Sequence, residues 1–262
     1  MTRALRPTHF HSAKLMRVLA ELALLDTAAP GGDFAEKLGL WVSFTDAIAL
    51  CAAHSTSPAR QSATHNRSAT QNPADAALDL ASYFARARAT LEQALHPSGA
   101  PRGSRSRIAL PAPDLALPIE AKIAFEPYRR YYQAQQREME LNVDTLRTRV
   151  RGGLAQASTA LQQLAALDGA LATILGGRES SLLATLPTLL EKRFNHLLQA
   201  HQQTLTDTQR ADQPAQWLQA GGWLARFCQE LHTVLLAELD LRLQPTLGLV
   251  EALQNETTPE HA

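Results

Sequence analysis

An apolar residue recurs every seven positions through the second half of the chain, and this repeat constrains the fold more than any other feature. The repeat runs through Val143, Val150, Ala157, Leu164 and Leu171, and no proline lies between residues 127 and 187. Further leucines make the apolar stripe wider than a coiled-coil seam, which is typical of a long helix in a bundle. The chain has 45 Ala and 43 Leu but only 6 Val and 5 Ile, so it is rich in helix formers and poor in strand formers. The sequence therefore predicts an all-α protein.

Glycine and proline divide the second half into three predicted helices. The first follows Pro127, bends at Gly152-Gly153 and ends at Gly176-Gly177. The second carries Pro187 in its apolar run, which indicates a kink or a late start. We expect long antiparallel helices that form a C-terminal bundle.

The last predicted helix begins near Pro214 and ends at about Pro245. We therefore assign residues 119–250 to the helical bundle and residues 251–262 to a disordered tail.

Two helices are predicted near the start of the chain. The first runs from Ser12, as N-cap, to about Asp26, and the turn at Pro30-Gly31-Gly32 follows it. Asp33 and Glu36 resemble a capping box at the start of the second helix, which continues through Ile48. We expect an N-terminal helical hairpin packed on the C-terminal bundle.

Two segments lack the apolar residues needed for a core. Residues 54–72 predict a flexible loop within an N-terminal helical region of residues 1–95. A third helix follows Asn72-Pro73. Residues 96–118 are rich in Pro, Ser and Arg, so we place a linker and a domain boundary there.

Asp46 is the most informative polar residue because it lies among Phe44, Ala47 and Ile48, at the border of an apolar helix face. We favour a structural salt bridge to a base such as Arg17 on the preceding helix. A partner-binding or ion-coupled carboxylate is the alternative.

Neither a metal site nor a catalytic thiol stands out. His9 and His11 have the closest metal-ligand spacing, but no acid or thiol is near them. Cys51 and Cys228 lie in apolar helical patterns, which favours buried thiols in a reducing compartment and hence a cytoplasmic protein. The apolar run from Leu38 to Ala53 is too short to span a membrane, so we expect no transmembrane segment, and we expect no cofactor.

The charges balance at 25 basic and 25 acidic residues, so any electrostatic role must be local. Residues 1–17, 54–72 and 96–113 carry basic residues without a single acid: Arg3, Arg6, Lys14, Arg17, Arg60, Arg67, Arg102, Arg105 and Arg107. Because no aromatic residues are interleaved to stack on bases, we favour solubilising linkers over a nucleic-acid interface. Nucleic-acid binding through these basic arms stays an alternative.

The segment from Phe34 to Trp41, with its continuation from Phe44 to Leu50, resembles an uncharacterised proteobacterial family, domain of unknown function 3348. The helix from Leu15 to Leu22 and the Tyr-rich segment 128–132 are similar to that family in position and type. The family has no established activity, so the resemblance implies no residue roles. Its members tend to be encoded near membrane proton-channel components and OmpA-like proteins. The resemblance therefore implies a cytoplasmic accessory of an envelope assembly.

We favour a non-enzymatic helical protein that associates with itself or docks a protein partner through its long C-terminal helices, because their leucine-rich faces are wide. The residues that we select for an interaction or structural polar site are Asp46, Trp41, Arg17, Tyr128, Tyr131 and Tyr132. The rival hypothesis is a small-molecule enzyme with a pocket between hairpin and bundle, in which Asp46 and the tyrosines supply the polar groups.

Overall fold

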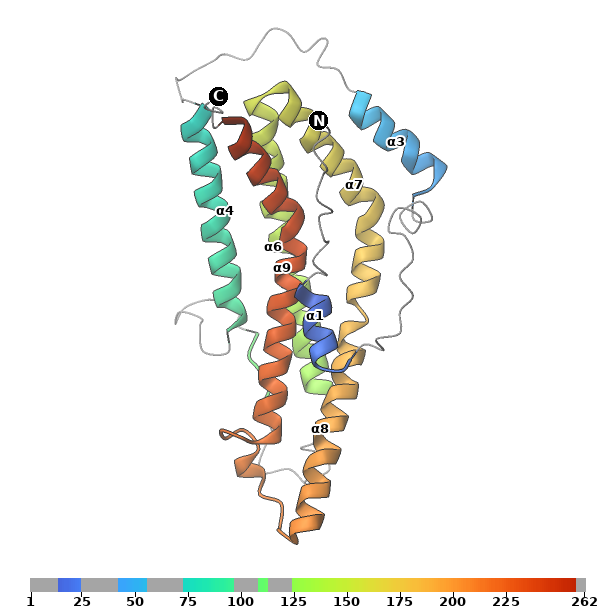
Figure 1. The fold of residues 1–262 in the computed structure, drawn as a ribbon, viewed down its shortest axis with the longest axis vertical. Helices are drawn as coiled ribbons and strands as arrows, with labels where there is room; N and C mark the ends of the chain where they lie inside the picture. Colours follow the sequence, from blue (N-terminus) through green and yellow to red (C-terminus); the bar gives the residue numbers. More distant parts are fainter. Residues whose placement is uncertain (1–13, 25–41, 56–72, 97–107, 113–123, 258–262) are drawn as a thin grey trace, which may run out of the picture. The chain divides into compact units, whose positions relative to one another are not determined.

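The computed structural model describes residues 14–24, 42–55, 73–96, 108–112 and 124–257. These residues are almost entirely helical, and no strand occurs among them (Figure 1). The helices are α1 (Lys14–Glu21), α3 (Phe44–Ser55), α4 (Pro73–Leu95), α6 (Glu126–Ala157), α7 (Thr159–Leu183), α8 (Leu186–Thr208), the 3-10 helix η1 (Pro214–Gln216) and α9 (Trp223–Thr257). The predicted all-α helical class is confirmed. None of these helices combines the length and the hydropathy that crossing a bilayer requires.

The chain forms two compact units, each made of three separate stretches. Unit 1 contains Met1–Ala29, Leu110–Tyr132 and Pro187–Leu241, and unit 2 contains Pro30–Ala109, Gln133–Leu186 and Arg242–Ala262. Both α6 and α9 therefore contribute to both units. The domain boundary at residues 96–118 stays a prediction, because most of that segment lies outside the described residues.

Unit 1 is built on α8 and α9, which run antiparallel (Figure 1). Phe194 is at the centre of its aromatic core, with ring centroids 5.0 Å from Phe227 and 5.2 Å from Trp223. Arg193 donates two hydrogen bonds of 2.7 Å to the carboxylate of Glu230, which joins α8 to α9 beside this core. Helix α1 adds Leu15, Val18 and Leu19 to the buried residues, and its Lys14 bonds Asp240 of α9 at 2.7 Å.

Unit 2 contains the reversal between α6 and α7. Ser158 has the extended backbone of an N-cap (φ −153°), and its hydroxyl accepts a hydrogen bond from the backbone N–H of Leu161. The predicted single long helix is therefore two helices. Gly153 of α6 lies against α4, since an added Cβ would meet the side chain of Leu80 at 2.9 Å.

Two predicted helix ends are wrong. Gly176-Gly177 does not stop α7, which continues to Leu183. Pro245 lies inside α9, which ends at Thr257, so residues 251–257 are helical rather than part of a disordered tail. Large apolar side chains on both sides of Pro245 are buried, and this packing outweighs the lost backbone hydrogen bond: Leu243, Leu249, Val250 and Leu253. Of the kink and the late start that Pro187 left open, the structure shows the late start, since α8 begins one residue before it.

The predicted N-terminal helices are present over part of their length. Helix α1 falls within the first predicted helix, and α3 covers the end of the second. The turn predicted at Pro30-Gly31-Gly32 lies outside the described part of the chain. Helix α4 begins at Pro73, as predicted.

Candidate functional site

The Asp46 carboxylate caps the start of α3. Its Oδ2 accepts hydrogen bonds from the backbone N–H of Ser43 at 2.9 Å and from the Ser43 hydroxyl at 2.7 Å. In return the Ser43 hydroxyl accepts from the Asp46 N–H at 3.2 Å, which completes a capping box. These bonds from Ser43 lower the pKa of Asp46 below its ordinary value. Both described hydrogen bonds of this carboxylate come from Ser43, and the predicted salt bridge to Arg17, which belongs to the other unit, stays a prediction.

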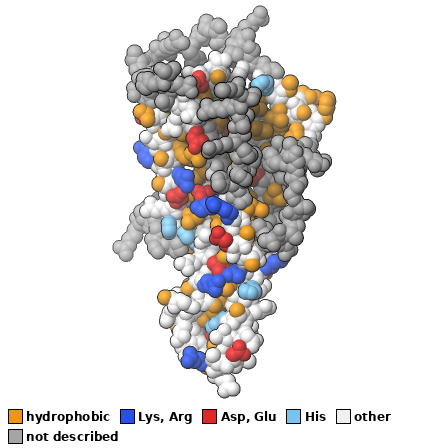
Figure 2. Space-filling view, viewed as in Figure 1, with side chains coloured by type: hydrophobic (Ala, Val, Ile, Leu, Met, Phe, Trp, Pro, Cys, Tyr) orange, Lys and Arg blue, Asp and Glu red, His pale blue; other side chains and the backbone are white. Residues whose placement is uncertain are grey.

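One side of α3 presents apolar side chains to solvent. Phe44 is 82 % exposed and Ile48 is 55 % exposed, and Cys51 is exposed on the same side at helical spacing. We call Phe44, Ile48 and Cys51 the outer face of α3. It carries no charged residue. Figure 2 shows hydrophobic side chains gathered at the upper right, where Figure 1 draws α3.

The other side of α3 is partly covered. Val42, Asp46, Leu50 and Ala53 have intermediate exposure and share this side, and α3 packs against α7. An apolar helix that is covered on only one side has the same sequence pattern as a fully buried helix. This explains why the prediction of a buried Cys51 is wrong, whereas Cys228 is buried as predicted.

The three selected tyrosines belong to the core of unit 1. The ring of Tyr128 lies edge-on to Phe227 at 5.4 Å, and burial raises its pKa above the ordinary value. Tyr132 donates a hydrogen bond of 2.7 Å to the carboxylate of Glu238, and Tyr131 is 5 % exposed. Each tyrosine therefore has a packing role. Trp41, which was selected with them, lies outside the described residues.

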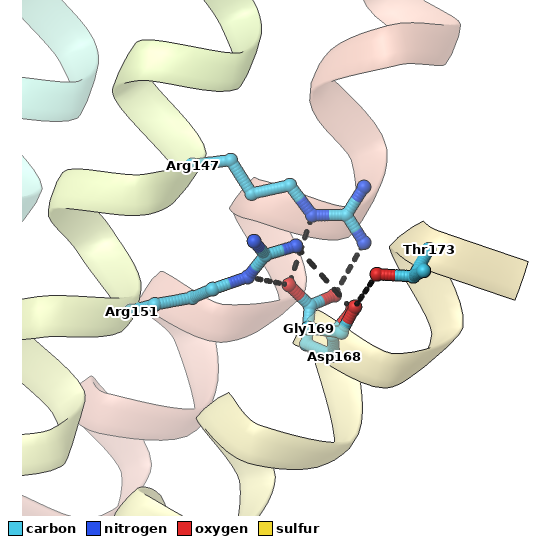
Figure 3. A network of polar contacts seen from close by, with 5 residues as sticks. All are labelled: Arg147, Arg151, Asp168, Gly169 and Thr173. Carbon is cyan, nitrogen blue, oxygen red and sulfur yellow. Dashed lines mark hydrogen bonds and ion pairs between the residues drawn. The ribbon is translucent and has the colours of Figure 1, made fainter. Parts of the chain in front are cut away.

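A partly buried charge network in unit 2 connects α6 to α7 (Figure 3). Arg147 and Arg151, one turn apart on α6, both point to the carboxylate of Asp168 on α7. Arg147 donates to Asp168 through Nε at 2.9 Å and Nη2 at 2.5 Å, and Arg151 donates through Nε at 2.6 Å. Burial favours the neutral acid, but the two guanidinium groups outweigh it and hold the pKa of Asp168 below its ordinary value.

The sequence contained a signal for this network that we missed. Asp168 interrupts an Ala- and Leu-rich stretch, and two arginines four residues apart occur on the helix before it. Arg149, between those arginines, lies over the ring of Tyr83 at 4.2 Å. The network binds two helices together and leaves the Asp168 carboxylate fully engaged.

A second polar cluster lies in unit 1, where the chain turns from α8 to α9. One oxygen of Asp212, Oδ1, accepts a hydrogen bond from the indole N–H of Trp217 at 2.8 Å and lies 3.0 Å from Nε2 of His201. The His201 ring stacks on Trp223, with centroids 6.0 Å apart and planes 27° apart. These four side chains line a cavity of about 660 Å³, which we call the tryptophan pocket.

The loop that forms this pocket has a fixed backbone. Gly221 has a φ of +86°, a conformation that favours glycine. An added Cβ on Gly222 would lie 2.2 Å from the carbonyl oxygen of Trp217. That same carbonyl accepts a hydrogen bond of 2.9 Å from the backbone N–H of Ala225, in the first turn of α9. Asp212 and Trp217 are thereby held against the N-terminal end of α9.

The fold and these clusters define an all-helical protein with internal charge networks and an aromatic-lined pocket. The described residues contain no group of three side chains placed to hold a metal ion. The model of a family described as protein of unknown function (DUF3348) matches residues 1–255, and the chain belongs to this family. No curated protein and no solved structure matches the chain.

Proposed function

We propose that this protein is a helical interaction protein that docks a protein partner through the outer face of α3. The observation that supports this proposal is the 82 % exposure of Phe44, on a side of the helix that carries no charged residue. Exposed apolar surface of this kind marks interaction sites, and aromatic anchors dominate the binding energy of protein interfaces. Burying a side chain such as Phe or Ile contributes about 1.5–3 kcal/mol.

The position of the surface differs from the one favoured by the sequence. We expected docking through the helices between Val143 and Leu243, but the large exposed apolar residues described there are separate ones, such as Leu182 on α7 and Leu218 after η1. Isolated exposed leucines are ordinary on a protein surface. The outer face of α3 places an aromatic residue, an aliphatic residue and a thiol on one side of one helix, so we assign the docking to α3.

The family resemblance suggests a cellular setting for this interaction. Attachment to an envelope proton-channel or OmpA-type assembly from the cytoplasm follows from the family resemblance, and it names the first partners to test. The alternative of nucleic-acid binding depends on basic residues such as Arg60 and Arg102, which lie outside the described residues.

The proposal is tested by placing one charge on the outer face. Ile48→Glu puts a carboxylate at the centre of the docking surface, where binding would have to desolvate it. Leu78→Glu is the matched control, because Leu78 is 63 % exposed on α4 of the same unit. We expect Ile48→Glu to lose the proteins that co-purify from the native host and Leu78→Glu to keep them, with unchanged circular dichroism in both variants. Retention of the same proteins by both variants would refute docking through α3.

A further inference from the structure

The tryptophan pocket has the size and the stiffness of a small-molecule site, and the proposed docking surface does not use it. Its volume of about 660 Å³ lies in the range of ligand pockets. Asp212 is held by Trp217 and His201, and both tryptophans are buried, at 1 % and 7 % exposure. The polar groups are therefore in place before a ligand arrives, which lowers the entropy cost of binding.

The lining of the pocket favours a ligand without net charge. Its ionisable residues are Arg210, Asp212 and His201, and the formal charges of the first two cancel. Its remaining polar side chains are neutral hydroxyls and amides: Thr204, Thr208, Gln213, Gln216 and Gln219. Neither a cation nor an anion would gain a net countercharge in this pocket.

The hydroxyls and the carboxylate in the lining can accept hydrogen bonds from a ligand. The hydroxyl of Thr204 donates to the carbonyl of Ala200 at 2.9 Å, and that of Thr208 donates to the carbonyl of Thr204 at 2.7 Å. Their protons are thus engaged within α8, and their lone pairs are what they can offer to a ligand. The Asp212 carboxylate, when ionised, only accepts. A ligand with several hydroxyl groups can donate hydrogen bonds to these acceptors.

The remaining lining is apolar. Trp217 and Trp223 line the pocket with little exposed surface, at 1 % and 7 % exposure, and Leu205 contributes an aliphatic side chain. Aromatic residues with a polar handle suit ligands that have both an apolar and a polar side. Sugar rings combine C–H surfaces with hydroxyl donors and carry no charge. From this match of size, charge and hydrogen bonding, we propose that the tryptophan pocket binds a neutral mono- or disaccharide.

The indole N–H signals of the protein in nuclear magnetic resonance spectra test this proposal. The chain has three tryptophans, and Trp41→Phe identifies the signals of Trp217 and Trp223. The probes are glucose, N-acetylglucosamine, maltose and trehalose, with glucosamine and glucuronate as charged counterparts. We expect at least one neutral sugar to shift both pocket signals to saturation, and the charged counterparts to bind more weakly.

Two threonine variants locate the binding. Thr208→Val removes one acceptor from the pocket, and we expect it to weaken binding about fivefold, as the loss of one hydrogen bond does. Thr206→Val is the matched control, because Thr206 makes the same type of bond to its own helix, to the carbonyl of Gln202, and does not line the pocket. The proposal is overturned if no neutral sugar shifts the signals, if a charged counterpart binds more tightly, or if both variants weaken binding equally.

Discussion

Replacing Asp168 by asparagine removes the one negative charge that holds Arg147 and Arg151 together, while nearly preserving the side-chain shape. The three side chains are only 11 %, 15 % and 20 % exposed, so the two guanidinium groups would keep their charges with little water to compensate. Removing one partner of a buried ion pair costs about 3–5 kcal/mol. Because both arginines retain some contact with water, we expect the lower end, about 3 kcal/mol, for Asp168→Asn.

Urea unfolding and thermal unfolding, both followed by circular dichroism, measure this loss. At about 2–4 °C for each kcal/mol in a chain of this size, the melting temperature should fall by about 6–12 °C. Arg130→Ala is the control, because the side chain of Arg130 is 77 % exposed in its pair with Glu126. The control should change stability by less than about 0.5 kcal/mol. A loss below about 1 kcal/mol for Asp168→Asn would show that the network does not hold α6 to α7 as argued.

Gly222→Ala should destabilise the protein by more than about 2 kcal/mol, because an added Cβ meets a backbone oxygen at 2.2 Å. Gly176→Ala, with open space around the new Cβ in α7, should stabilise it by about 0.5–1 kcal/mol, and equal changes in thermal unfolding would contradict this reasoning. With Ellman's reagent, exposed Cys51 should react in the native protein, whereas Cys228, whose pKa burial raises to about 11, should react only on unfolding. Burial would raise the pKa of the Glu230 carboxyl, but hydrogen bonds from neighbouring arginines hold it below its ordinary value, as at Asp168. The stabilisation from these carboxyls is therefore complete above the unfolded pKa of about 4 and is lost as the pH falls through the folded values below it. A free energy of unfolding that stays constant from neutral pH to pH ~2 would contradict this assignment.

The helical class was predictable because it depends on a period and a composition, both of which are local properties. The helix ends were less predictable, since Gly176 and Pro245 are ordinary stop signals that packing overrides in α7 and α9. The capping box of Ser43 and Asp46 was readable as a Ser-x-x-Asp pattern. We extended an earlier helix across it and interpreted Asp46 as half of a salt bridge instead.

The clusters that carry chemistry were harder to predict, because their members are far apart in the sequence. Asp168 is 17 residues from Arg151, and Asp212 is 11 residues from His201 on the other side of a turn. Neither spacing is a motif, and each cluster exists only because a reversal of the chain brings two helices together. The exposure of Phe44 was unpredictable for a related reason, since a periodic pattern shows which residues share a side but not which element covers that side.

The central claim, that the outer face of α3 docks a protein partner, is tested most directly by a photo-crosslinking amino acid. It would be placed at Ile48 and, in a separate variant, at Leu78, which is exposed on α4. After irradiation in the native host, the account predicts a discrete adduct of higher mass from position 48 that Phe44→Ser abolishes, and no such adduct from position 78. The absence of an adduct at position 48, or the same adduct from both positions, would contradict the account.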